Sequence, residues 1–386
     1  MEQSMIRLQA QLMKDYYKDF SRYAKGKKPE CKIAWVTAFT PVEILEALGM
    51  DYYYPESYAA VIAASGKEQE LMQECERQHL TADCCSYSCC FEGCVSLEKG
   101  PRGIPPKPDV LIATNNQCNT LPNWWNILAQ RYHVPLIILD YPGEYVSGDY
   151  AYDYVRKQHE DLIFKLEILS GNKLDMSVLD KMIRNSKNSV QAWERIVDEF
   201  AVRAIRPTEL FDGISFLITA RCKEETAQLY VLMQEEFQKY SMADLTLTPV
   251  FWLGYPLWYH KDRYLSEIFD GFRMVGSNYI TWWNLDYSGD TPLERLFQAY
   301  NYTFLNLKQN SRTKKLMECI KRSKAAGTVT LRNKSCKCDF VSARNIGLPQ
   351  AELEIDMIDR MYLDTGKARR QMELLKEAIC IVSELI

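Results

Sequence analysis

Short apolar runs alternate with amphipathic stretches along the chain, and this alternation predicts a parallel α/β fold. In the first part of the sequence, apolar runs of strand length lie at 31–38, 108–114 and 134–140. The segments 41–50 and 121–133 between these runs place their apolar residues at helical spacing. Strand, helix and strand at such spacing predict parallel strands that are joined by crossover helices.

The second part of the chain repeats this order after a long stretch with helical periodicity and one polar face. Its four strand candidates lie at 247–257, 271–277, 327–333 and 351–356, with helical segments between them. We therefore predict two α/β domains with helical additions. The expected division is a helical N-terminal segment 1–30, a first α/β domain 31–150, a helical connecting segment 151–206, and a second α/β domain 207–386 that ends in a helix.

Composition excludes two classes of partner. The 386 residues are 47% hydrophobic and 25% charged with a net charge of -4, so no basic field is present for nucleic acid or anionic membrane. No apolar run approaches the roughly 20 residues that a membrane-spanning helix needs. The N-terminus is charged throughout and lacks the apolar core of a signal peptide. We expect a cytoplasmic protein.

Cysteine is the residue type that points to chemistry. The chain has 13 cysteines, and five of them fall in the twelve residues 83–94, "DCCSYSCCFEGC". An odd number cannot pair completely, and clustered cysteines in a reducing compartment more often bind metal or carry out redox chemistry. Three explanations stay open at this point, namely an iron–sulfur cluster, a zinc site and small buried side chains that only pack.

Two of the cysteines follow strand candidates of different domains. Cys118 lies just beyond the run 108–114, and Cys336 lies just beyond the run 327–333. Ligands of open parallel sheets bind beyond the carboxyl ends of the strands, so these thiols and the cysteine-rich stretch are expected to meet in the cleft between the domains. The sequence lacks CxxC pairs, which favours a buried cluster over a zinc knuckle.

Nucleotide-binding motifs are missing from the sequence. It contains neither GxxxxGK[ST] nor a GxGxxG that follows a strand. It also lacks the GxSxG and HExxH motifs of common hydrolases. If the function requires ATP, we expect another protein to bind it.

Several segments, in order over nearly the whole chain, resemble the 2-hydroxyacyl-CoA dehydratase and benzoyl-CoA reductase family. The first segment is similar to the opening strand and helix of that family, the next three to its cysteine motifs, and the last to its closing strand and helix. These segments are "KIAWVTAFTPVEILEALGM" (32–50), "CSY" (85–87), "PKPDVLIATNNQCNT" (106–120), "RNKSC" (332–336) and "ELEIDMIDRMYLDTGKARRQMELLKE" (352–377).

The resemblance implies a fold, a cofactor and partners. The fold would be two flavodoxin-like doubly wound domains with a [4Fe-4S] cluster in the cleft between them. Carried over by position, the ligands are Cys85, Cys118 and Cys336, and the fourth iron is left for a non-protein ligand. The implied enzyme is a lyase, or alternatively a reductase, that acts on an acyl-CoA. Its partners would be a related second subunit and a separate ATP-hydrolysing iron–sulfur activator that delivers electrons at low potential.

The remaining cysteines of the motif region exceed the family pattern. One interpretation is that they pack inside the fold. The other is that they are additional ligands, because some relatives hold a double-cubane [8Fe-9S] cluster and act as homodimers on small molecules. These surplus cysteines are Cys84, Cys89, Cys90, Cys94 and Cys338.

Other residues could complete the site. Glu56 follows the first strand–helix unit and is the candidate acid or base, although a solvated loop carboxylate is the alternative. The aromatic segment "FWLGYPLWYH" (251–260) could line an apolar acyl pocket. The short chain and the absence of a hydroxyl at Ala38 favour a small subunit that relays electrons. A non-catalytic scaffold is a further alternative, against which the three intact cysteines argue.

Overall fold

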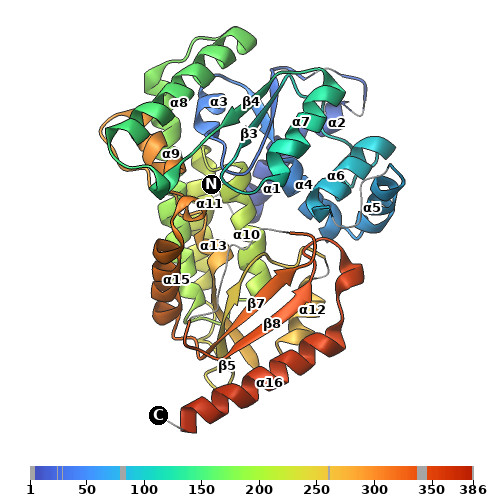
Figure 1. Ribbon diagram of the computed structural model, residues 1–386, viewed down its shortest axis with the longest axis vertical. Coiled ribbons are helices and arrows are strands. Elements are labelled where there is room, and N and C mark those ends of the chain that lie inside the picture. The colour runs from blue at the N-terminus through green and yellow to red at the C-terminus, as the bar shows by residue number, and fades with distance from the viewer. Residues whose placement is uncertain are drawn as a thin grey trace.

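The computed structural model describes residues 5–23, 25–27, 29–78, 84–259, 261–336 and 346–384 (Figure 1). Within these residues the strands form two separate four-stranded sheets, and every strand pair in both sheets is parallel. In Figure 1 the first sheet occupies the upper half of the molecule and the second sheet the lower half, with α10 (Pro207–Thr219) and α11 (Glu224–Phe237) between them. The α/β class expected from the sequence is therefore confirmed.

The first sheet has the strand order β2-β1-β3-β4, which is the order of flavodoxin-like sheets. Its central strand β1 is buried along its whole length, as expected for a parallel strand covered on both faces. The elements of this part are β1 (Ile33–Val36), α3 (Val42–Ala47), β2 (Asp51–Tyr53), α4 (Pro55–Ala64), α5 (Glu68–Arg77), α6 (Ser86–Leu97), β3 (Val110–Thr114), α7 (Thr120–Tyr132) and β4 (Leu136–Leu139).

The second sheet has the equivalent order β6-β5-β7-β8. Helix α16 contacts β8 and runs along the bottom of this sheet in Figure 1. The elements are β5 (Thr248–Leu253), α12 (Lys261–Ile268), β6 (Phe272–Ser277), α13 (Asn278–Thr281), α14 (Pro292–Asn301), η2 (Phe304–Asn306), α15 (Gln309–Ser323), β7 (Gly327–Asn333), β8 (Gln350–Ile355), η4 (Arg360–Tyr362) and α16 (Thr365–Glu384).

Helices account for the N-terminal segment and for the stretch between the sheets. The N-terminal segment is two helices, α1 (Met5–Tyr16) and α2 (Lys18–Tyr23), and α1 packs on α11. Helix α9 (Met176–Phe200) packs on α11 and also contacts α3 of the first part. The other elements of the middle stretch are η1 (Gly143–Tyr145) and α8 (Asp149–Ser170).

Two details differ from the sequence pattern. The pattern does not predict the strand β2, because its three residues are too few to show a periodicity. The helical stretch 291–326 is divided into α14, η2 and α15. The side-chain amide of Asn306 donates to the carbonyls of Tyr300 and Asn301, each at 3.1 Å, and so satisfies carbonyl groups that a helix end leaves open.

A buried ion pair joins the first part of the chain to the helical middle. Glu43 of α3 and Arg221, which follows α10, are 0% and 1% exposed. The Nε atom of Arg221 lies 3.3 Å from Oε1 of Glu43, which also accepts hydrogen bonds from Ser186 and Tyr287 at 2.8 and 2.7 Å. The Tyr300 hydroxyl donates to Oε2 at 2.6 Å. Such full pairing is what allows two charges to be buried.

No helix within the described ranges is long and apolar enough to cross a bilayer. This agrees with the absence of long apolar runs in the sequence.

Candidate functional site

The carboxyl ends of the strands bring the three cysteines of the family motifs together. Cys118 follows β3, Cys336 follows β7, and Cys85 stands at the N-terminal end of α6. Burial raises the pKa of the Cys85 thiol well above its ordinary value, and the nearby thiols of Cys336 and Cys118 raise it further. A thiol in this surrounding stays protonated unless a metal compensates the charge of the thiolate.

A direct contact between the two halves of the molecule positions two of these cysteines. Ser86, next to Cys85, and Ser335, next to Cys336, are buried and their hydroxyl oxygens lie 2.9 Å apart. The Ser335 hydroxyl donates to Oδ2 of the buried Asp356 at 2.5 Å. The start of α6 is thereby held against the loop that follows β7.

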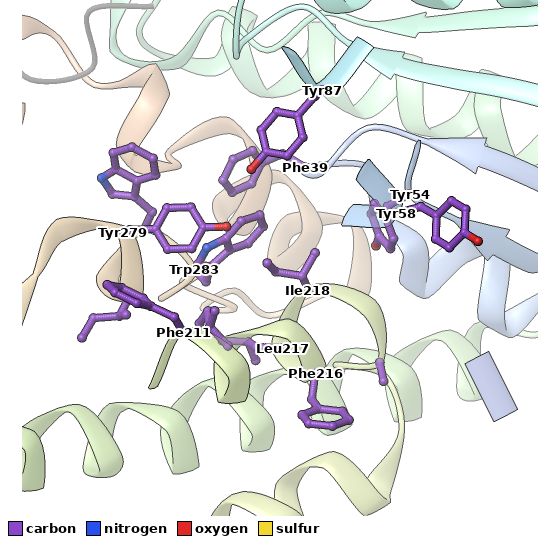
Figure 2. Close-up of a cluster of buried hydrophobic side chains, with 14 of the residues drawn as sticks. Phe39, Tyr54, Tyr58, Tyr87, Phe211, Phe216, Leu217, Ile218, Tyr279 and Trp283 are labelled. Atoms are coloured by element: carbon purple, nitrogen blue, oxygen red, sulfur yellow. The ribbon is translucent and has the colours of Figure 1, made fainter. Parts of the chain in front are cut away.

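A cavity of about 420 Å³ is lined by close sequence neighbours of two of these cysteines, namely Tyr87, which lies two residues after Cys85, and Gln117, which precedes Cys118. Its walls come from α1, α4, α10, the start of α6 and the segments that follow β1, β3, β5 and β6. Figure 2 shows part of the wall, where Phe39, Tyr87, Tyr279 and Trp283 surround the same space. Phe39 stacks on Trp283 with ring centroids 4.9 Å apart, so this part of the wall is formed by packed aromatic rings.

Part of the segment 251–260 contributes to the cavity as its composition indicated. Tyr255 and Trp258 line the cavity, and the indole N–H of Trp258 donates to the Tyr87 hydroxyl at 2.6 Å. Trp252, by contrast, is fully buried and donates to the carbonyl of Tyr255 at 3.0 Å. The segment therefore supplies both a wall of the cavity and the core beneath it.

Glu56 lies in the first turn of α4 and lines the cavity. Its Oε2 atom accepts a hydrogen bond of 3.3 Å from the backbone N–H of Ala38. Burial and the neighbouring Cys118 raise the pKa of this carboxyl to about 8, and the Ala38 N–H opposes the shift only in part. The carboxyl is thus close to a motif cysteine and can hold a proton near neutral pH.

Three surplus cysteines lie inside the packing of α6. Cys89, Cys90 and Cys94 are 3%, 0% and 0% exposed. Burial raises the pKa of Cys94 to about 12, and a hydrogen bond with Cys75 of α5 is the largest cause of the raised pKa of Cys89. None of the three lines the cavity.

The interface that holds these cysteines is unusually tight. At Gly93 of α6 a Cβ atom would lie 1.8 Å from the carbonyl oxygen of Leu71 in α5, so only glycine fits. Cys84 directly precedes Cys85 and is half-buried. Cys338 lies outside the described residues.

We expect replacement of the α6 cysteines to leave iron binding intact. In Cys89→Ala and Cys94→Ala the iron content should remain at about four per chain, with a loss of about 1 kcal/mol in the free energy of unfolding from the smaller buried side chain. Iron and acid-labile sulfide analysis of anaerobically purified protein measures this. A loss of roughly half the iron from an eight-iron preparation would instead establish the double-cubane cluster.

The sequence pattern missed one part of the site. The segment after β6 supplies Tyr279, Trp282 and Trp283 to the cavity wall. The signal was present, because the aromatic residues directly follow a strand candidate and strand ends are where parallel sheets place their ligands. The Ser86–Ser335 contact, in contrast, joins residues 249 positions apart and has no local signal.

The described residues contain no group of three His, Cys, Asp or Glu side chains that could hold a single metal ion. This argues against a mononuclear zinc site in the described part of the chain. A cubane makes a different demand, since each of its thiolate ligands binds a different iron and the sulfur atoms stand further apart.

Comparisons with known proteins identify the family of the chain. A family model described as "2-hydroxyglutaryl-CoA dehydratase, D-component" matches residues 37–379. The chain is 26% identical to the (R)-2-hydroxyisocaproyl-CoA dehydratase alpha subunit of Clostridioides difficile, over 92% of each chain. It is 23% identical to the lactoyl-CoA dehydratase subunit alpha of Anaerotignum propionicum, over 89% of this chain and 90% of that protein. It is also 23% identical to one of the subunits of the benzoyl-CoA reductase of Thauera aromatica, over 96% of this chain and 93% of that protein. The chain therefore belongs to the 2-hydroxyacyl-CoA dehydratase and benzoyl-CoA reductase family.

Proposed function

We propose that this chain is the iron–sulfur subunit of a radical 2-hydroxyacyl-CoA dehydratase that depends on an ATP-hydrolysing activator. The single observation that carries the proposal is the placement of Cys85, Cys118 and Cys336, which come from both sheets and lie beside one apolar cavity. The relatives named above are subunits of dehydratases and of a reductase, so reduction of an aromatic acyl-CoA is the alternative reaction.

The three thiols suit a [4Fe-4S] cluster. They are gathered from separate strand ends and the Ser86–Ser335 contact holds two of the three segments together. None of the described residues that shift the pKa of Cys85 is a cation. A bound metal group would therefore supply the positive charge that balances a thiolate at this position. When bound, the cluster supplies a single electron of low potential to the acyl-CoA.

The protein residues then have three tasks. The aromatic wall excludes water from the cavity and so limits loss of the electron to solvent. The walls from α1, α4 and α10 hold the thioester. We assign Glu56, which lines the inner part of the cavity, to proton exchange with the substrate during loss of water.

The cavity favours substrate binding by this chain itself, in addition to electron relay. The alignments span nearly the whole of relatives named as alpha subunits, so the length of the chain does not set it apart from them. The iron content of the purified chain distinguishes two alternatives. About eight irons per chain would indicate a double-cubane reductase, and the absence of iron would indicate a scaffold.

Reconstitution tests the proposal. Purified alone, the chain should neither hydrolyse ATP nor dehydrate an acyl-CoA, because it has no phosphate-binding loop and receives no electron. Activity should require a related subunit and a cluster-bearing ATPase, added in turn under strict anaerobiosis with a 2-hydroxyacyl-CoA. ATP-dependent turnover by this chain alone would contradict the need for partners.

A further inference from the structure

The cavity has two regions of different chemistry. Its aromatic chamber is walled by Phe39, Tyr87, Tyr255, Trp258, Tyr279 and Trp283. Its corridor runs between α1, α4 and α10 and carries hydroxyl and amide side chains, among them Gln9, Ser57, Ser215 and Thr219.

One face of α4 forms the floor of the corridor. Ser57, Ala60, Val61 and Ala64 recur at the spacing of a single helix face, and exposure increases toward Ala64. From Ser57 to Ala64 this face extends about 10 Å. The corridor is therefore a passage from the surface inward, with small side chains along it and polar groups that suit the amides of a pantetheine arm.

The charge of the lining restricts what the chamber can bind. Of the described residues that line the cavity, two are acidic, Glu56 and Asp212, and none is Lys, Arg or His. Asp212 is exposed and so belongs to the mouth, whereas Glu56 lies inside. A ligand carboxylate in the chamber would therefore meet no cation among the described lining residues.

Two described guanidinium groups near the cavity are already engaged. Arg221 is buried against Glu43 and donates to the Thr40 carbonyl at 2.9 Å. Arg102 lies over the ring of Tyr17, 5.7 Å from its centroid, at the corridor rather than at the chamber. Neither lines the cavity.

From this lining we infer that the substrate carries an apolar acyl side chain, branched or aromatic, and that an acyl group with a terminal carboxylate is rejected. The inference rests on the proposed function and narrows its substrate class. Aromatic rings bury large apolar area and favour such a side chain, whereas a carboxylate would lose its hydration and meet only neutral donors, with no cation to balance its charge.

A matched pair of thioesters tests this on the wild-type chain. In 2-hydroxy-4-methylpentanoyl-CoA the side chain ends in an isopropyl group, and in 2-hydroxysuccinyl-CoA, whose thioester carbonyl is next to the carbinol carbon, a carboxylate of similar size takes its place. We expect the first to bind the anaerobically purified full-length chain at least about 100-fold more tightly in isothermal titration calorimetry. No activator is present, so no turnover disturbs the measurement.

The outcomes separate the inference from the function. Equal affinity for the two thioesters, or tighter binding of 2-hydroxysuccinyl-CoA, overturns the inference and leaves the proposed function standing. If neither thioester binds while the cluster is intact, this chain does not hold the acyl group and the inference is overturned, and the reconstitution assay then decides whether the proposed function stands.

A charge-introducing variant provides an independent check. Leu305 lines the cavity, next to Phe304, which stacks on Trp282. Leu305→Arg should weaken binding of the 4-methylpentanoyl thioester and strengthen binding of 2-hydroxysuccinyl-CoA, each by about tenfold or more. Leu374→Arg, at a 48% exposed position of α16, is the control and should keep the wild-type preference.

Iron content and melting temperature establish that the Leu305→Arg chain is folded. A folded variant with the wild-type preference would show that the chamber does not hold the acyl group, and would overturn the inference.

Discussion

Replacing Cys118 or Cys336 with serine is expected to abolish the broad visible absorption of the cluster and to reduce the iron content from about four per chain to near zero. Both residues follow strands at the same edge of their sheets and lie within electrostatic reach of Cys85. Iron in such clusters is held by thiolate sulfur, which a serine hydroxyl does not replace. Absorption spectra and iron analysis of anaerobically purified protein measure the effect.

Cys319→Ser is the matched control. Cys319 is half-buried, as Cys118 and Cys336 are, but it lies within α15, and none of the three motif cysteines is among the causes that shift its pKa. The control should retain full iron content and the wild-type spectrum. Full iron in both Cys118→Ser and Cys336→Ser would show that the ligands have been assigned to the wrong residues.

The convergence of these cysteines could be predicted because it depends on a local signal and a general rule. The run before Cys118 is continuously apolar, as in a strand buried on both faces, and the segment before Cys336 is rich in Thr, Val and Leu, which favour strands. Parallel strands align their carboxyl ends at one edge of the sheet. Knowing that each cysteine follows such a run is enough to place both in the cleft. No long-range contact has to be guessed.

The role of the surplus cysteines could not be decided in this way. Cys90 and Cys94 are four residues apart, a spacing that serves buried packing on a helix and repeated ligation equally well. Their environment depends on how closely α5 approaches α6, which Gly93 allows but does not dictate. Only the three-dimensional arrangement shows that their side chains are buried away from the cavity.

Pairs of charges that are distant in sequence are the least accessible to sequence reasoning. Glu43 and Arg221 are separated by 178 positions, and each stands in a segment whose pattern reads as ordinary α/β structure. Nothing local distinguishes Glu43 from Glu46, three residues later on the same helix. Yet the side chain of Glu43 is fully buried, whereas that of Glu46 reaches the surface.

Glu43→Gln is expected to lower the free energy of unfolding by about 3–5 kcal/mol, because it leaves the buried guanidinium of Arg221 without its counter-charge. The substitution preserves the shape of the side chain, so the loss reports the charge. It also weakens the hydrogen bonds from Tyr287 and Tyr300, which now meet a neutral acceptor. Chemical denaturation of wild type and variant measures the difference.

Two variants control for other causes. Glu46→Gln makes the same change on the same helix, where the partner is the more exposed Lys223. It should lower the free energy of unfolding by no more than about 1 kcal/mol. Combining Glu43→Gln with Arg221→Met should recover part of the loss, since no unpaired charge then remains buried. A cost for Glu43→Gln equal to that for Glu46→Gln would contradict the assigned role of the buried pair.

Acidification tests the same charge without mutation. Burial by itself would raise the pKa of Glu43, but Arg221 and the hydroxyls of Tyr300 and Tyr287 outweigh it and hold the pKa below its ordinary value. The stabilisation of the folded protein by the Glu43 charge is therefore fully present above the pKa of an unfolded glutamate, about 4.3, and is lost as the pH falls below that value. The stability difference between wild type and Glu43→Gln should narrow in that range.

Buried His159 adds a separate loss that begins at higher pH. Burial lowers its pKa to about 4, against about 6.5 in an unfolded chain, so the unfolded state binds the proton first and stability falls between these two values. This loss is common to wild type and Glu43→Gln down to about pH 4, but below that pH the two proteins differ, because the charge of Glu43 raises the pKa of His159. The comparison is therefore made with His159→Gln present in both proteins. A difference that stays constant from pH 7 to pH 3 would show that Glu43 does not carry its charge in the folded protein.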